Sequence, residues 1–134
     1  MDIGIDIENI SRFKSMIEVD RLKNKSYLKS SILNSIFTNK ELDFFLKSNK
    51  NEEIITNLAC FFSCKESILK AFRTGLINDF LMTDIEIFFD KNNRLNVKFT
   101  GSLKKEVEKQ KIKYVNISYS HIKDTVISSA VIEK

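Results

Sequence analysis

Apolar and polar residues alternate at the very start of the chain. Residues 2–7 place Ile3, Ile5 and Ile7 on one face and two acidic residues and a glycine on the other. This spacing of two is the period of a β-strand. We therefore predict a strand with one face in the hydrophobic core, formed by the isoleucines, and one acidic face that includes Asp6.

The same alternation returns in the second half of the chain and predicts two hairpins. Four segments show it: 84–90, 94–100, 114–120 and 125–133. Helical spacing and end signals predict four helices, over about 9–22, 41–48, 52–74 and 102–111. Thr38 and Glu41 have the spacing of a capping box, and Gly75 is a candidate C-cap. Residues 22–31 are polar and basic, and predict either a connection or a frayed helix.

In order along the chain, these elements are one strand, three helices, two strands, one helix and two strands. This order predicts an α+β fold with a mainly antiparallel sheet packed with a long central helix. A chain of 134 residues is long enough to bury a core, so residues 1–134 are predicted to form a single domain.

A lysine stands out within the long helix. The apolar stripe of this helix consists of Ile54, Leu58, Phe61, Phe62, Leu69 and Phe72. At about 100° per residue, Lys65 falls near the centre of the stripe. The cost of burying an ammonium group requires either a partner or a side chain that extends to water. Glu66 follows at the edge of the stripe, with Lys70 at i+4 from it, which would also suit a surface ion pair.

The composition is that of an ordinary globular protein, with 43% hydrophobic and 30% charged residues. The N-terminal residues are acidic rather than basic and no apolar run has the length of a membrane span, so a cytoplasmic protein without a membrane segment is expected. Cys60 and Cys64 lie four apart, and because His121 is the sole histidine, free thiols are expected rather than a zinc site. The net charge of +4 permits an acidic partner without selecting one.

Chemistry could occur in three places. Asp6 and Glu8 share one face of the first strand. Two carboxylates this close either bind a cation such as Mg²⁺ or form an edge of the strand that is exposed to solvent. Glu66 could supply another oxygen, and the neighbouring lysines suit phosphate. His121 ends an alternating strand. It could be an ordinary turn residue, a hydrogen-bond donor to phosphate or a proton carrier. Together these groups indicate magnesium-assisted chemistry on a diphosphate, without a P-loop or a dinucleotide fingerprint.

Four motifs occur in a characteristic order and spacing: GIDIENISRF, FTNKEL, FFSCKESILKAFRTG and SYSHIKD. They resemble the holo-acyl-carrier-protein synthases, which are 4′-phosphopantetheinyl transferases, and the resemblance covers nearly the whole chain. It implies the corresponding α+β fold. The implied reaction is transfer of phosphopantetheine from coenzyme A to a serine of apo acyl carrier protein, with release of adenosine 3′,5′-bisphosphate. The implied setting is lipid metabolism, in fatty acid biosynthesis.

The resemblance also implies roles for individual residues. It assigns Mg²⁺ to Asp6 and Glu66, with Glu8 as a third acid found in larger relatives, and catalysis to Asp6, Glu66 and Lys70. The implied coenzyme A contacts are Lys65, Lys70, Thr74, Gly75, Ser120 and His121. Arg12 and Arg21 would meet the carrier protein, whose acidity matches a basic face over residues 12–29. The proton of the carrier serine would pass to Glu66 through a metal-bound water, or else to a water held by Asp6 or His121.

The small synthases of this family are homotrimers with sites shared between subunits, so a homotrimer is implied here. The chain departs from the family where Arg73-Thr74-Gly75 replaces the usual GTG. One alternative is an inactive relative that only binds an acidic carrier. The other alternative is a nucleic-acid-binding domain, and its only support is the mildly basic charge. The basic residues do not alternate with exposed aromatic residues, as binding of single-stranded nucleic acid requires, and this argues against it.

Overall fold

A computed structural model describes residues 1–16, 31–72 and 80–134 of the chain. Its elements, in chain order, are β1 (Asp2–Asn9), α1 (Ile10–Met16), α3 (Ser31–Ile36), α4 (Asn39–Phe45), α5 (Asn51–Ala71), the 3₁₀ turn η3 (Met82–Asp84), β2 (Ile85–Phe89), β3 (Leu95–Phe99), α6 (Gly101–Lys109), β4 (Tyr114–His121) and β5 (Thr125–Glu133). The predicted α+β fold is confirmed.

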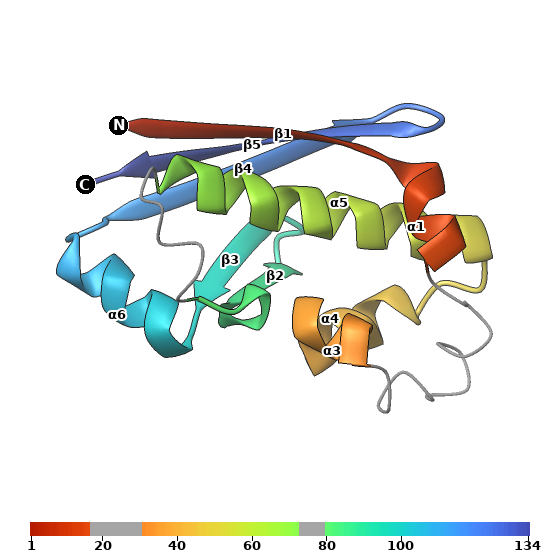
Figure 1. Cartoon of the computed structure of the whole chain (residues 1–134), viewed down its shortest axis with the longest axis horizontal. Coiled ribbons are helices and arrows are strands. Elements are labelled where there is room, and N and C mark those ends of the chain that lie inside the picture. Colours follow the sequence, from red (N-terminus) through yellow and green to blue (C-terminus); the bar gives the residue numbers. More distant parts are fainter. Residues whose placement is uncertain (17–30, 73–79) are drawn as a thin grey trace.

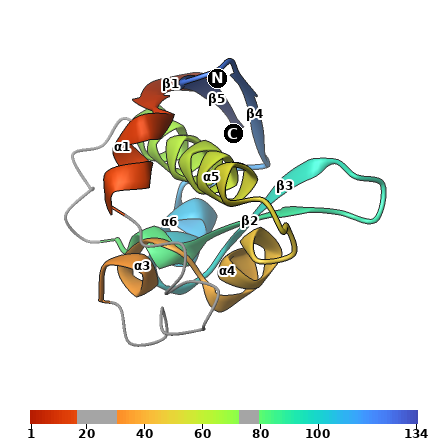
Figure 2. The ribbon, with the colours of Figure 1, turned by 90° about the vertical axis from the view of Figure 1, so that its right-hand side faces the viewer.

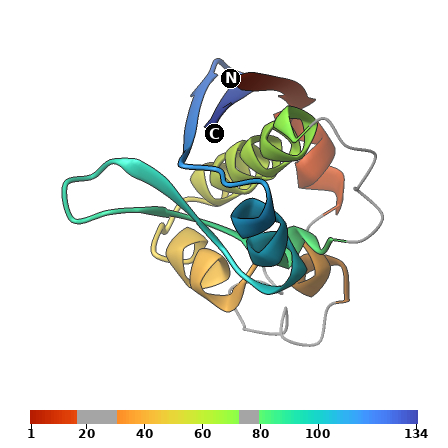
Figure 3. The ribbon, with the colours of Figure 1, turned by 90° about the vertical axis from the view of Figure 1, so that its left-hand side faces the viewer.

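The long helix α5 lies at the centre of the molecule. On one side it packs along an antiparallel sheet with strand order β1-β5-β4. Figure 1 shows α5 running beneath this sheet, with both chain termini at the same end. The end-on views in Figures 2 and 3 show α3, α4 and α6 on the other side of α5, and the β2–β3 hairpin projecting past it.

Contact between β1 and α5 depends on a glycine. A Cβ atom built on Gly4 would lie 1.9 Å from the Ser67 carbonyl oxygen and 2.6 Å from the Ala71 nitrogen. Only glycine therefore lets the strand approach the helix backbone this closely. The face of β1 that carries Gly4 is consequently the inner face, and Asp6, two residues on, also faces α5.

This orientation overturns the prediction for the isoleucines of β1. Ile3, Ile5 and Ile7 are 59%, 58% and 65% exposed, whereas Gly4 and Asp6 are buried. Alternation separates the two faces of a strand but does not say which one meets the core. Here the space beside α5 admits glycine and a short carboxylate, and excludes the branched side chains.

The two predicted hairpins are confirmed. In the first, Ile85 pairs with Phe99 and Ile87 with Val97. In the second, β4 pairs with β5 in antiparallel register. The first hairpin forms a separate two-stranded sheet against α4 rather than extending the three-stranded sheet.

The helices agree with the prediction in part. The capping box is confirmed, since Thr38 Oγ1 accepts from Glu41 N and Glu41 Oε1 accepts from Thr38 N. Helix α5 ends at Ala71, before the predicted end at 74, and Gly75 lies outside the described residues. The sequence interpretation missed α3. Among the described helices, none is long and apolar enough to cross a membrane.

Candidate active site

The Asp6 carboxylate is the centre of the candidate site. It is 6% exposed and lies between β1 and α5. Its Oδ1 accepts a hydrogen bond from Lys70 Nζ at 2.9 Å, and its Oδ2 accepts one from Ser63 Oγ at 2.9 Å. Lys70 also donates to the Ile5 carbonyl oxygen at 3.2 Å, which holds its ammonium at the strand. Hydrogen bonding to Asp6 raises the pKa of Lys70 and favours its charged form.

Two further carboxylates, those of Glu8 and Glu66, lie close enough to Asp6 for its charge to raise their pKa values. Burial raises the pKa of Glu8, and the neighbouring Asp6 charge raises it further. Burial likewise raises the pKa of Glu66, again with a contribution from Asp6, while Lys70 and Arg12 oppose the increase. Carboxylates that repel one another in this way are stabilised by a cation placed among them.

Helix α1 lies next to the acidic cluster. Arg12 Nη1 lies 3.3 Å from Glu8 Oε2, so α1 touches the acidic cluster directly. The start of α1 is fixed to the β4–β5 turn by Asp124, whose side-chain oxygens accept from Ser11 N at 2.9 Å and Ser11 Oγ at 3.1 Å. The position of Arg12 is therefore tied to the turn that follows His121.

Lys65 does not join this site. Its ammonium has no exposed area and points to the opposite side of α5, where it donates to Glu41 Oε1 at 2.6 Å. It also donates to the carbonyl oxygens of Ile36 at 2.7 Å and Met82 at 3.2 Å. The geometry thus contradicts both a phosphate contact and a side chain that reaches water. Lys65 was correctly placed in the apolar stripe, but its role here is to join α5 to α4.

The remaining predicted site residues are dispersed. His121 lies in the same cross-strand row as Val126 and Glu8, so two strand spacings of about 4.8 Å separate His121 from Glu8. Ser120 pairs with Ile127 and lies on the outer face of the sheet, away from Asp6. The predicted residues Thr74, Gly75, Arg21 and Arg73 lie outside the described residues.

The oxygen donors at this site suit a hard divalent cation. Asp6 and Glu8 are close enough for a side-chain hydrogen bond between them to contribute to the raised pKa of Glu8. Within the described ranges, however, no group of three ligand side chains already converges as a metal site would. The residues therefore fit a cation held by one or two carboxylates and completed by a ligand, which is how Mg²⁺ is commonly bound beside phosphates.

Sequence reasoning missed several residues that shape this site. Ser63 and Ser128 are buried and lie next to Asp6, and Glu41 was interpreted only as part of a capping box. A buried carboxylate needs donors, and small hydroxyl residues on the inner face of a helix could have indicated them. The partner of Lys65 could not be identified in this way, because Glu41 lies 24 positions away.

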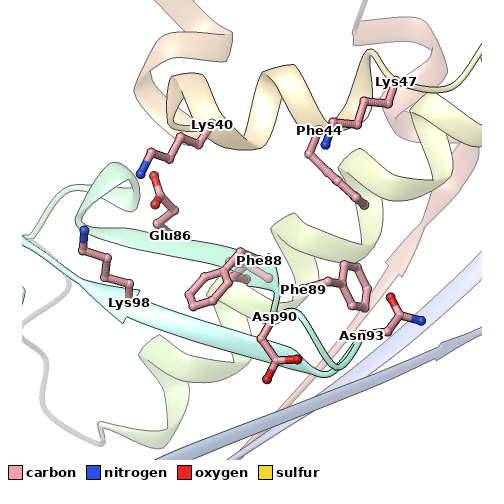
Figure 4. Close-up of a pocket in the computed structure, with 10 residues that line it drawn as sticks. Lys40, Phe44, Lys47, Glu86, Phe88, Phe89, Asp90, Asn93 and Lys98 are labelled. Carbon is pink, nitrogen blue, oxygen red and sulfur yellow. The ribbon is translucent and has the colours of Figure 1, made fainter.

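A separate groove, with a volume of about 530 Å³, lies between α4 and the β2–β3 hairpin. Figure 4 shows Lys40 extending from α4, Lys47 from the turn that follows this helix and Lys98 from the hairpin, with Phe88 and Phe89 between them. Glu86 and Asp90 also line it, so the charges are mixed. The groove contains none of the predicted site residues.

Comparison with known proteins decides the family. The family model described as the 4′-phosphopantetheinyl transferase superfamily matches residues 2–128. The chain belongs to this superfamily. The predicted family, and with it an enzyme of the phosphopantetheinyl transferase class, is confirmed.

Close relatives carry one shared name. The holo-[acyl-carrier-protein] synthase of Clostridium tetani is 35% identical over 133 residues, covering 99% of this chain and 95% of the relative. The synthase of the same name from Caldicellulosiruptor saccharolyticus is 34% identical over 133 residues, covering 99% and 96%.

Solved structures agree with this assignment. The holo-[acyl-carrier-protein] synthase of Neisseria meningitidis superposes with a TM-score of 0.79 at 29% identity, over 99% of this chain and 98% of that one. The Helicobacter pylori synthase, solved in complex with coenzyme A, has the same fold, with a TM-score of 0.74 at 23% identity over 98% and 99% of the two chains.

Proposed function

We propose that this protein transfers 4′-phosphopantetheine from coenzyme A to a serine of apo acyl carrier protein, in a Mg²⁺-dependent reaction. The observation that carries the proposal is the acidic cluster around Asp6 with the Lys70 ammonium bound to it at 2.9 Å. Carboxylates that need a cation, beside a lysine able to meet phosphate, match a diphosphate substrate. The names of the full-length relatives support the same reaction.

In this proposal, Asp6 and Glu66 would hold Mg²⁺, and Glu8 would be the third acid beside it. Bound there, the metal would neutralise the diphosphate and the charge that develops on the leaving adenosine 3′,5′-bisphosphate. The Lys70 side chain is 51% exposed, so its ammonium can also reach a phosphate at the surface.

The bond changes involve few protein groups. The carrier serine oxygen forms a bond to the phosphorus that bears pantetheine, and the bond from that phosphorus to the leaving bisphosphate breaks. The serine proton would pass to Glu66 through a water, or alternatively to a water held by Asp6 or His121.

A homotrimer is part of the proposal. The outer face of β1 and β5 exposes Ile3, Ile5, Ile7 and Ile127, and contiguous exposed apolar surface commonly marks an interface between chains. Ser120 lies on this outer face, so it would reach a bound coenzyme A only in a neighbouring subunit. Sedimentation should show a trimer, and replacing Ile5 with lysine should yield a monomer. A fully active monomer would refute the shared site.

The carrier contact is proposed for α1 and the residues that follow it. Arg12 is about half exposed beside Glu8, so an acidic partner could contact its guanidinium at the surface. Arg21, the coenzyme contacts at Thr74, Gly75 and His121, the cytoplasmic location and the setting in fatty acid biosynthesis remain proposals based on the family resemblance. The exclusion of nucleic acid as a partner belongs to the same proposal.

The test is direct. The protein is incubated with coenzyme A, Mg²⁺ and several apo carrier proteins, and the carriers are weighed by intact mass spectrometry. We expect one carrier to gain the mass of phosphopantetheine. If the protein binds carriers but transfers nothing at any metal concentration, the alternative of an inactive binding relative replaces this proposal.

A further inference from the structure

Two buried serines form a hydrogen-bonded chain that ends on Asp6. Ser63 Oγ lies 2.9 Å from Asp6 Oδ2, and Ser128 Oγ lies 2.8 Å from Ser63 Oγ. Ser63 has no exposed area and Ser128 is 2% exposed. Ser63 belongs to α5 and Ser128 to β5, where it is the cross-strand partner of Asp6. The carboxylate is therefore held from the helix and from the neighbouring strand together.

The chemistry of these groups fixes the direction of the chain. An ionised carboxylate can only accept hydrogen bonds, so Ser63 must donate its single hydroxyl proton to Asp6. Ser63 has no second proton, and Ser128 must therefore donate to Ser63. Each hydroxyl polarises the next one, and the bond to the charged end is strengthened.

The two oxygens of Asp6 thus have separate tasks. Oδ2 is occupied by Ser63, whereas Oδ1 faces the Lys70 ammonium, which is the cation present at this site. With Oδ2 fixed, rotation of the carboxylate would break a buried hydrogen bond, and this keeps Oδ1 directed at whatever cation occupies the site.

We propose that Ser63 and Ser128 are positioning residues that orient Asp6 toward the divalent cation of the transferase. This inference rests on the proposed function. Residues that hydrogen-bond a metal ligand typically change metal affinity or activity by about 10- to 100-fold when they are removed. Serines that only fill space would show no such effect.

The chain offers a matched control on the same helix. Ser67 is also fully buried, but its hydroxyl donates to the Cys64 carbonyl oxygen at 2.9 Å and not to a carboxylate. Ser63→Ala and Ser67→Ala each remove one buried hydroxyl from α5. Both variants are expected to fold, because alanine is smaller and favours helix.

Binding of Mn²⁺, measured by electron paramagnetic resonance in the presence of coenzyme A, is the main readout. Ser63→Ala should weaken Mn²⁺ binding about tenfold or more, and Ser67→Ala should leave it unchanged. At saturating metal, kcat of Ser63→Ala should largely recover, which separates positioning from loss of fold. The proposal would be overturned if both variants bound Mn²⁺ as tightly as the wild-type protein, or if both lost the same amount of affinity.

A second variant tests the chain itself. Ser128→Ala should weaken Mn²⁺ binding less than Ser63→Ala does, and it should add nothing further in the Ser63→Ala background. Independent, additive losses would refute a chain that acts through Ser63. If the wild-type protein transfers phosphopantetheine but binds no Mn²⁺, this inference and the metal assignment both fail while the transferase function stands. If it neither binds Mn²⁺ nor transfers phosphopantetheine, the proposed function fails as well.

Discussion

Replacing Lys65 with methionine tests the role of the buried ion pair. The ammonium and the Glu41 carboxylate both have side chains without exposed area. Methionine keeps the length of the side chain but removes three hydrogen bonds, to Glu41, Ile36 and Met82. Glu41 would remain buried with only two backbone donors, Thr38 N and Ile87 N. Burial already raises the pKa of Glu41, so loss of its cation disfavours the charged form further.

The expected cost follows from the burial. Removal of one partner of a buried pair typically costs about 3–5 kcal/mol, because an uncompensated charge remains inside. For a chain of this size, that loss corresponds to a fall in Tm of roughly 10–20 °C. Urea unfolding of Lys65→Met measures the free energy directly, with Lys105→Met, an exposed lysine on α6, as the matched control.

A double variant separates the ion pair from packing. Lys65→Met with Glu41→Gln removes both charges, and it should be more stable than the sum of the two single changes predicts, by at least about 1 kcal/mol. Additive losses would refute the pairing as the source of the effect. A Lys65→Met cost no larger than that of Lys105→Met would refute the whole argument.

Other expectations follow from the same geometry. Glu66→Gln should lower turnover by about 10²–10⁴-fold without loss of fold, as circular dichroism and the mass assay would show. Lys14→Glu should raise the KM for the carrier protein and leave coenzyme A binding unchanged. Arg12→Glu should weaken the binding of both substrates, because Arg12 contacts Glu8 of the acidic cluster. If the two variants had the same effect on coenzyme A binding, this distinction would be wrong. Gly4→Ala should destabilise by about 3 kcal/mol, because β1 must move away from α5, and an unchanged Tm would contradict the close approach. The native thiols should resist dithionitrobenzoate at about pH 8, since burial raises the pKa of Cys60 to about 12, and should react after unfolding.

Much of the fold was accessible from the sequence because its signals are local. The capping box at Thr38 and Glu41, the two hairpins and the long helix each depend on neighbours within a few residues. Helix α3 was missed because a six-residue helix, SILNSI, contains too few turns to show a periodic stripe. The place of Lys65 within the apolar stripe was also visible, since position on a helix face is a local property, although the sequence did not show whether its ammonium is buried or reaches water.

The errors concern relations between distant segments. Alternation in β1 could not decide which face is inside, and Gly4 was the one residue whose type carried that information. Adjacency in sequence suggested that Lys65 and Glu66 serve one site, yet only Lys70 reaches Asp6. Spacing along a helix gives the direction of a side chain but not the partner that another element brings to it.

Helix α5 is anchored on two opposite faces, and this fixes the Asp6 carboxylate beside it. Toward α4, Lys65 is bound by three acceptors, and toward β1, Ser63 and Lys70 hold the Asp6 carboxylate from either side. A rotation or shift of α5 that preserved one set would break the other. Glu66 lies between Lys65 and Lys70 in the sequence of this helix, and the charge of Asp6 contributes to its raised pKa. In the proposed reaction, the anchored helix would hold the Glu66 carboxylate beside the cation.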